Sequence, residues 1–514
     1  MHRAGRLALD RFQAKWIPVG RPERGLTQDS RATHPSPTGR GRRGVALGFS
    51  LAAFAAACAG RPDLPPPPDA YVAGQALGPE AAAALATAPE AAWVAGLATE
   101  EVSSFVREAL LANPDLGVAT ERARAARWRA RGAFGSNLLP NISLGLGGSR
   151  QETPDPAGGR IRTDLMTSEA VASWEVDLWG RLSARTLAAD LDADALEADL
   201  YGARLSVAGQ TAQAWVGLVE ATQNLALARE DLETRNRALD ITQRRYERGV
   251  SDSLALRTAR SQTASARAAE AQAADALLIA ARRLQELLGR YPDGALAPGA
   301  ALPALDALDA AGAPRDLLER RPDVLAAEAR LRAAGFRAHE ARAALLPRLT
   351  ITARADGSGQ GLTDIVDSRD LVTNVIGGLT APIFNGGALL SESRASEADR
   401  RAAASDYVAA ALAAWREVEA AISADASLAV REAELDNAVI EAREAQDLAE
   451  REYGRGVATI FELIDAYTRR IDAERGLISA RAARVSNRIA FHVAVGGGAE
   501  TGGMRTPSDD ETTP

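Results

Sequence analysis

Residues 246–250 read Tyr-Glu-Arg-Gly-Val, and residues 453–457 read Tyr-Gly-Arg-Gly-Val, an offset of 207 positions (453 − 246). The same offset separates Pro140 from Pro347. It is far longer than the roughly 20–50 residues of a solenoid repeat. The pattern predicts an internal duplication, in which each half contains a short helix, two strands and two very long helices.

Long uninterrupted helices are predicted around these two turns. Residues 181–291 and 383–506 contain no proline, and apolar side chains in residues 460–489 recur at steps of three and four, which is typical of coiled-coil packing. Each turn comes 69 residues after the glycine that follows the strands (249 − 180 and 456 − 387), so the intervening helix would be about 100 Å long. We expect two antiparallel hairpins that turn at Gly249 and Gly456, because glycine adopts left-handed conformations without steric cost.

Alternating sequence predicts two strands in each half. In residues 142–146 and 166–178 the even positions are mostly apolar, and the charges of the second segment fall on odd positions. In residues 349–355 and 371–383 the apolar side chains occupy odd positions instead. Because the offset of 207 is odd, a duplication requires this change of parity. Each strand should therefore have one apolar and one polar face.

Four such strands cannot close a barrel within one chain. An open sheet edge cannot lie in lipid, because its backbone amides would have no hydrogen-bond partner. Either the sheet is a small soluble one that other elements cover, or several chains pool strands of about ten residues into one membrane barrel with a charged interior. Residues 149–163 and 357–370, which are rich in Gly, Asp and Pro, are predicted to be the outer loops.

The composition argues against several functions. Only 4% of the 514 residues are aromatic and alanine is abundant, which is typical of long helices packed through small side chains. A net charge of −8 argues against binding of nucleic acid. Cys58 is the only cysteine, so we expect no disulfide within the chain and no cysteine-based metal site. We find no phosphate loop, metal-ligand spacing or nucleophile motif, so neither a cofactor nor an enzymatic activity is predicted.

The first 57 residues are predicted to be a signal peptide. Basic residues at 40–43 precede an uncharged run at 44–57 that is too short to span a bilayer. Small residues directly before Cys58 resemble a bacterial lipobox, which predicts cleavage before this cysteine and acylation of its thiol and new amino terminus. The alternative is an ordinary cleaved signal with an incidental cysteine. Residues 58–98, rich in Pro, Ala and Gly, should form an extended lipidated tether.

The rest of the chain is predicted to contain the two repeats. The first repeat covers residues 99–291, a crossover linker covers 292–315, and the second repeat covers 316–497. The second repeat should open with a helix over residues 316–345. The polar, acidic residues 498–514 are predicted to be a disordered tail.

In combination, several motifs resemble those of the TolC-type outer-membrane efflux proteins, closest to the lipoprotein branch that serves resistance-nodulation-division pumps. They extend over about residues 93–495 and include, besides the two turns, residues 174–181 (Trp-Glu-Val-Asp-Leu-Trp-Gly-Arg), 316–324 (Asp-Leu-Leu-Glu-Arg-Arg-Pro-Asp-Val), 327–328 (Ala-Glu), 346–347 (Leu-Pro), 382–387 (Pro-Ile-Phe-Asn-Gly-Gly) and 417–419 (Glu-Val-Glu).

The resemblance implies a mainly α-helical homotrimer with a membrane β-barrel. Each chain would supply four transmembrane strands to a barrel of twelve, and below it a tunnel of coiled-coil helices would extend through the periplasm. The trimer would be lipid-anchored in the bacterial outer membrane. It would serve as the passive exit duct of an inner-membrane pump, joined to it by a periplasmic adaptor, and would export small molecules such as drugs or metals.

The resemblance also implies a periplasmic gate at the helix turns. Tyr453, Glu462 and Asp465 match the family's gate tyrosine and its two tip acids. The two acids lie three positions apart and so share a helix face. Three copies would form a cation-selective ring of six carboxylates. The alternative is two solvated acids on an ordinary helix. The acidic partner expected on the other hairpin falls at Ala255, with Asp252 nearby, so the cross-links of the gate are expected to differ.

The tips of the two hairpins are the predicted adaptor contacts. They comprise Gly249, Val250, Ser251, Gly456, Val457 and Ala458. Two other functions stay open at this point: a soluble structural coiled-coil protein, and an exit duct for type I protein secretion. The exported compound is not encoded in this chain, because the pump selects it.

Overall fold

The computed structural model describes residues 100–299, 301–305, 308, 319–359 and 372–497. All of them belong to the second of two compact units, residues 67–514. The predicted signal peptide, Cys58, the tether over residues 58–98 and the tail over residues 498–514 lie outside the described residues, as does most of the crossover linker. None of the described helices combines the length and the apolar composition that a bilayer crossing requires.

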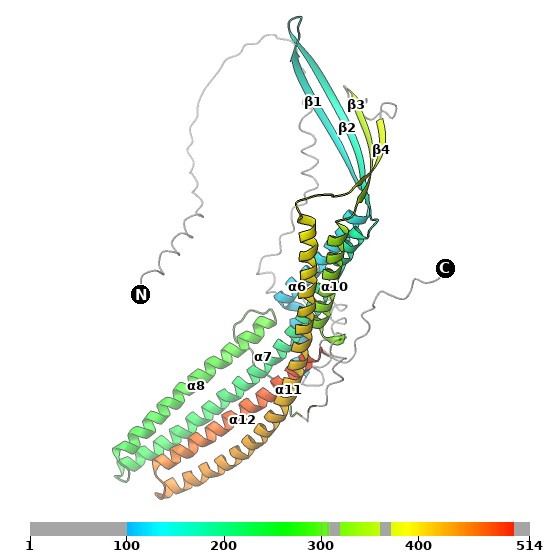
Figure 1. Ribbon diagram of the computed structural model, residues 1–514. Coiled ribbons are helices and arrows are strands. Elements are labelled where there is room, and N and C mark those ends of the chain that lie inside the picture. Colours follow the sequence, from blue (N-terminus) through cyan, green and yellow to red (C-terminus); the bar gives the residue numbers. More distant parts are fainter. Residues whose placement is uncertain (1–99, 300, 306–307, 309–318, 360–371, 498–514) are drawn as a thin grey trace, which may run out of the picture. The chain divides into compact units, whose positions relative to one another are not determined.

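Two antiparallel helical hairpins make up most of the described chain (Figure 1). The first consists of α7 (Arg181–Glu247) and α8 (Ser253–Leu287), and the second consists of α11 (Ala388–Arg455) and α12 (Ile460–Ala494). With 67 and 68 residues, α7 and α11 are each about 100 Å long. Both turns contain a left-handed glycine, Gly249 with a φ of 71° and Gly456 with a φ of 82°. The predicted hairpins are confirmed.

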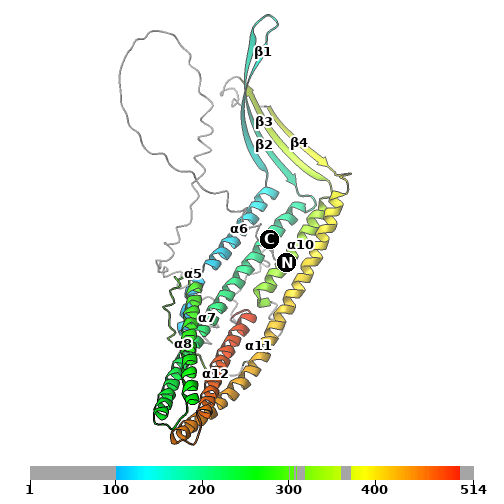
Figure 2. The same cartoon turned by 90° about the vertical axis from the view of Figure 1, so that its left-hand side faces the viewer.

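The helices lie side by side in one layer (Figures 1 and 2). Two shorter helices, α5 (Glu100–Ala112) and α6 (Pro114–Leu138), precede α7, and α10 (Pro322–Ala343) precedes the second pair of strands. Near the sheet the order of packed neighbours is α6, α7, α10 and α11. Toward the turns it is α8, α7, α12 and α11. The two repeats therefore pack against each other along α7, and α6, α8 and α11 form the edges of the layer.

The helix predicted over residues 316–345 is interrupted at Arg321. Glu319 and Arg320 are helical, residues 316–318 lie outside the described part, and α10 starts at Pro322 after Arg321 in extended conformation (φ −74°, ψ 124°). A residue before proline is pushed out of the helical region, and proline fits the first helical position, so the sequence Arg-Pro marks a helix start. The same logic starts α6 at Pro114, where the side chain of Asn113 caps the helix.

Four antiparallel strands form one sheet in the order β1, β2, β3, β4. They are β1 (Asn141–Pro154), β2 (Arg160–Val176), β3 (Arg348–Gly359) and β4 (Val372–Thr380). Residues that pair directly across strands share a face. The register places the predicted apolar side chains on one face, including Ile142, Leu144, Leu146, Trp174, Ile351, Val375 and Leu379. The predicted alternation and its change of parity are confirmed.

The predicted loop over residues 149–163 is wrong. Strands β1 and β2 continue as a hairpin whose turn comprises only residues 155–159, and Ser149 pairs with Leu165 at the position where the loop was expected. Residues 148–151 (Gly-Ser-Arg-Gln) pair with β2 although they are polar. Both faces of this extension carry polar or mixed side chains, so the segment has no alternation of hydrophobicity that would mark it as a strand. In the second half β3 extends to Gly359, and residues 360–371 lie outside the described part.

The strands also end earlier than the alternation predicts, at Val176 and Thr380 instead of near residues 178 and 383. After β2 the chain turns so that the Asp177 carboxylate accepts hydrogen bonds from the backbone N–H groups of Leu182 (2.9 Å) and Ser183 (2.8 Å). These hydrogen bonds satisfy backbone N–H donors in the first turn of α7, and they fix the orientation of α7 relative to β2.

Candidate functional site

The turns of the two hairpins lie together at the end of the helices that is farthest from the sheet (Figure 1). A small apolar cluster joins them, and its buried members are Ala238, Ala255, Tyr453, Ala458, Ile460, Leu463 and Tyr467. The cluster contains residues of both hairpins. The geometry of this tip therefore depends on contacts between the two repeats.

Tyr453 is the central link of the tip. Its side chain is 4% exposed, and its hydroxyl lies 2.8 Å from the hydroxyl of Thr242 on α7. The guanidinium of Arg245, also on α7, donates a hydrogen bond to the carbonyl of Tyr453 and lies 4.7 Å from the centre of its ring. Tyr453 thus connects α11 to α7 through a neutral hydrogen bond and a cation–π contact. No carboxylate takes part in either contact.

Glu462 has a structural role in the first turn of α12. Its carboxylate accepts hydrogen bonds from the backbone N–H of Thr459 (2.6 Å) and from the Thr459 hydroxyl (3.0 Å), and together the two residues form a capping box. The Thr459 backbone N–H and then its hydroxyl hold the pKa of Glu462 below its ordinary value. Asp465, one turn further on, is also exposed and pairs with Arg469 at 2.7 Å. The two acids share a face as expected, and their role in a gate stays a prediction.

Most of the predicted adaptor contacts are accessible in the chain. Val250 and Val457 are 66% and 74% exposed at the ends of the two turns. Ala458 is buried in the tip cluster, so its side chain is not available to a partner in this conformation. Asp252 accepts a hydrogen bond from the backbone N–H of Ala255 (2.8 Å) and caps α8, while Ala255 itself is buried. The position where the family's acidic partner was expected is therefore part of the apolar cluster.

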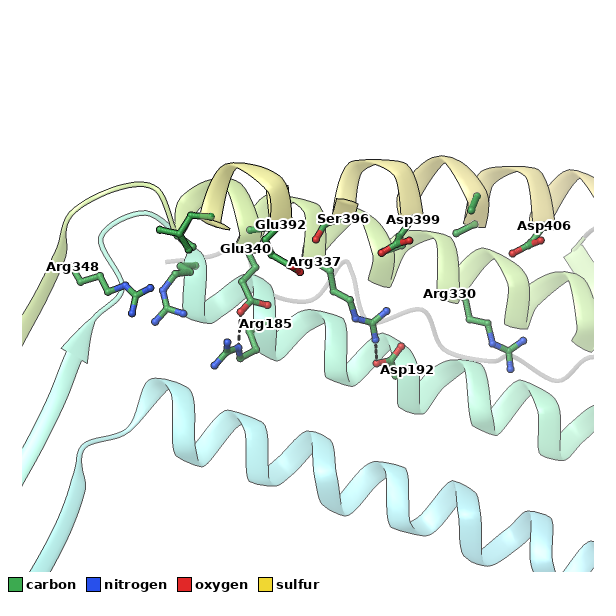
Figure 3. Close-up of a pocket in the computed structure, with 17 residues that line it drawn as sticks. Arg185, Asp192, Arg330, Arg337, Glu340, Arg348, Glu392, Ser396, Asp399 and Asp406 are labelled. Atoms are coloured by element: carbon green, nitrogen blue, oxygen red, sulfur yellow. Dashed lines mark hydrogen bonds and ion pairs between the residues drawn. The ribbon is translucent and has the colours of Figure 1, made fainter. Parts of the chain in front are cut away.

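A groove of about 830 Å³ lies on α7, α10 and α11 next to the sheet (Figure 3). Arg330 and Arg337 project from α10 and form ion pairs with Asp199 and Asp192 of α7. These two guanidinium groups are therefore neutralised by carboxylates of the neighbouring helix.

The groove opens on the same side of the molecule as the polar face of the sheet. Arg181 lines the groove, and its guanidinium binds the carboxylate of Glu175 at 2.8 Å. Glu175 occupies an odd position of β2, which belongs to the polar face. Arg348 occupies the polar face of β3 and also lines the groove. One continuous polar surface therefore runs from the strands onto the helices.

Three acids of α11 line the other wall of this groove. Glu392, Asp399 and Asp406 are spaced by seven residues, are exposed, and have no ion-pair partner within the described part of the chain (Figure 3). Their spacing of seven residues is visible in the sequence and places all three on one face of α11. The contacts of Thr242 and Arg245 had no such signal, because they depend on how the two repeats pack.

Among the described residues, no three His, Cys, Asp or Glu side chains are grouped so that they could hold a metal ion. The features that remain are a two-faced sheet with open edges, long paired helices and a tip held by contacts between repeats. These features are typical of a protein that assembles with other chains or forms a channel, and not of a protein with an enclosed binding site.

The chain belongs to the outer membrane efflux protein family, whose model matches residues 105–290 and 313–497. The two matched segments correspond to the two repeats.

Individual relatives support this assignment. The pyoverdine export outer membrane protein OpmQ of Pseudomonas putida is 30% identical over 84% of this chain and 94% of its own length. The outer membrane protein OprJ of Pseudomonas aeruginosa is 29% identical over 80% of this chain and 87% of its own length. Among solved structures, the outer membrane protein VceC of Vibrio cholerae superimposes with a TM-score of 0.70 at 25% identity, over 78% of this chain and 97% of that one.

The comparisons confirm the family that the sequence motifs predicted. They also confirm the outer membrane as the location of the protein and an efflux channel as its type of function. The relatives are transport channels and not enzymes.

Proposed function

We propose that three copies of this chain form the exit duct of a tripartite efflux system. The observation that carries the proposal is a four-stranded sheet with a continuous apolar face, whose edge strands β1 and β4 have no further strand beside them among the described residues. In lipid the backbone groups of both edges require partners, and closure with other copies supplies them. Three copies would contribute twelve strands.

The opposite face of the sheet fits the interior of such a duct. It carries polar and charged side chains, among them the Glu169–Arg354 ion pair at 3.2 Å. This surface continues into the groove where Glu392, Asp399 and Asp406 lie unpaired in the described chain. The unpaired carboxylates along this surface would attract cations to the wall of the duct.

The partners we propose are an inner-membrane pump and a periplasmic adaptor that docks at the hairpin tips. The exposed Val250 and Val457 support docking there, because they present apolar side chains at the free end of the helices. A lipid on Cys58 would add a membrane anchor. The cargo we propose is a small molecule, and the relative OpmQ is named for the export of pyoverdine.

Fractionation and conductance test this function together. The protein should remain in the outer membrane fraction, run as a trimer after extraction with detergent, and open ion channels in planar bilayers. A chain that is monomeric and stable in buffer without detergent would instead support the soluble coiled-coil alternative and contradict the duct.

Neutralising the two tip acids should reduce the cation preference of the channel. In Glu462→Gln/Asp465→Asn the trimer loses six carboxylates, and glutamine keeps the capping box because its side chain also accepts from the Thr459 backbone. The measurement is the cation-to-anion permeability ratio in planar bilayers. Glu441→Gln/Glu444→Gln, an exposed pair with the same spacing on α11, is the control and should change the ratio less. An unchanged ratio in the tip variant refutes the proposed gate.

A bulky residue at Gly456 should abolish efflux while trimers persist. Gly456→Trp places a large side chain at the tip where we propose that the adaptor docks. Gly456→Asn separates docking from backbone strain, because asparagine tolerates the left-handed conformation that this position has (φ 82°). We expect loss of drug tolerance in cells with the tryptophan variant only, with normal trimer levels in both. Normal drug tolerance with Gly456→Trp would count against docking at this turn.

A further inference from the structure

The extension of the β1–β2 hairpin beyond the apolar band carries a charged patch. On the face that holds Ile142, Leu144 and Leu146, the side chains change from apolar to charged after Gly148 and its partner Met166. We call the charged residues that follow on this face the hairpin ladder; they are Arg150, Glu152, Arg160, Arg162 and Asp164. They lie in the segment that the sequence motifs did not identify as strand.

The hairpin ladder is held by two ion pairs between the strands and one within β2. Arg150 binds Asp164, its direct partner in the register, at 2.6 Å. Arg162 lies 3.5 Å from the same carboxylate, and Arg160 lies 3.4 Å from Glu152. The side chains remain 47–67% exposed. The ladder is therefore ordered by its own contacts and still accessible.

The charges of the hairpin ladder do not cancel. Three guanidinium groups share two carboxylates, and Asp164 serves two of them. Each chain therefore presents one net positive charge on this face, and three chains would present three. An arginine with one carboxylate contact keeps free N–H donors for a second anion, and its planar fork matches phosphate oxygens.

The position of the ladder matches the border of a bilayer. Residues 166–176 of β2 carry the apolar band, and eleven positions (176 − 166 + 1) are the length that a tilted strand needs to cross the hydrocarbon core, about 9–11 residues. The ladder begins two positions beyond that segment, on the same lipid-side face. Side chains there would meet headgroups and not acyl chains.

We propose that the hairpin ladder binds anionic, phosphate-bearing headgroups of outer-leaflet lipids. The apolar band would contact the acyl chains of the same lipids, so that one continuous face of the hairpin would fix the depth of the barrel. This inference rests on the proposed trimeric barrel, because it requires the apolar face to point toward lipid.

Lipid selectivity measured by electron paramagnetic resonance tests the proposal. The full-length trimer is reconstituted in phosphatidylcholine vesicles with trace amounts of spin-labelled phosphatidic acid or spin-labelled phosphatidylcholine. The measured quantity is the ratio of the two association constants, phosphatidic acid over phosphatidylcholine, obtained from the motionally restricted fraction of each spin label. For the wild type this ratio should be about two to five, as expected for one net cation near a lipid surface. Arg150→Gln/Arg160→Gln/Arg162→Gln leaves only the two carboxylates and should lower this ratio to one or below, and Glu152→Gln/Asp164→Asn should raise it above the wild-type value.

Arg354→Gln is the matched control, because Arg354 lies on the opposite, polar face of the same sheet. Its ratio should equal that of the wild type. A triple arginine variant that forms conducting trimers with an unchanged ratio overturns the ladder proposal and leaves the duct intact. A wild type that neither inserts nor conducts contradicts both proposals.

Discussion

Replacing Leu144 by arginine is expected to prevent assembly of the outer-membrane trimer. Leu144 lies in the apolar band of β1, is 73% exposed in the single chain, and pairs with Ala170 of β2. An arginine on the lipid face near the middle of the bilayer costs about 2–4 kcal/mol, and a trimer would contain three. The measurement is the fraction of chain that runs as a heat-sensitive trimer on gels of isolated outer membranes.

Ser143→Arg is the matched control for this substitution. Ser143 is adjacent in sequence but lies on the polar face, opposite Val171. The new arginine would point into the proposed lumen near Glu169, so trimers should form and only conductance should change. Wild-type trimer levels with Leu144→Arg would show that the apolar face does not contact lipid, and the barrel would have to be abandoned.

The sequence predicted the strands well where the two faces of the sheet meet different surroundings. Between Ile142 and Leu146 one face is apolar and the other is small or polar, so the alternation is clear. Beyond Gly148 charged side chains replace the apolar ones on the same face, and the segment resembles a loop in composition. Alternation of hydrophobicity disappears there although the strands continue, which explains the error at residues 149–163.

The helical hairpins were predictable because their signals are local. Periodic apolar positions, the absence of proline and a glycine turn each follow from a few neighbouring residues. The capping box of Thr459 and Glu462 was also readable, since threonine followed three positions later by glutamate is typical of a helix start. The partners of Tyr453 were not, because Thr242 lies 211 positions away (453 − 242) in the other repeat.

The two repeats have the same fold but different environments at their tips. Tyr453 is buried between the hairpins, whereas its counterpart Tyr246 is 42% exposed. After its turn, the second repeat has a capping box and two acids at the start of α12. The corresponding helix of the first repeat, α8, begins instead with a cap by the Asp252 side chain alone. Duplication therefore explains the architecture, and divergence of the second repeat explains why the candidate gate residues occur once in each chain.

Substitution of Arg470 by methionine is expected to destabilise the helical part by about 3–5 kcal/mol, the usual cost of removing one partner from a buried ion pair. The Arg470 side chain on α12 is only 5% exposed. It binds Glu474 at 3.1 Å and Glu230 of α7 at 2.6 Å. The substitution would leave the carboxylate of Glu474, 7% exposed, with Arg443 as its remaining partner. Circular dichroism of the detergent-solubilised trimer should record a large fall in Tm.

Two further variants distinguish a buried charge from a general packing defect. In Arg470→Met/Glu474→Met no uncompensated buried charge remains, since Arg443 and Glu230 are 64% and 59% exposed. Apolar replacement of a whole buried pair is often close to neutral, so most of the lost stability should return. Glu230→Gln removes a partner that is 59% exposed, and its expected cost is below about 1 kcal/mol. If Arg470→Met and the double variant lose the same stability, the stranded Glu474 carboxylate is not the cause of the loss, and the expected penalty for a buried charge is wrong. Because both variants lack the Arg470–Glu230 contact between the repeats, recovery in the double variant would assign the loss to the buried Glu474 carboxylate and not to that contact.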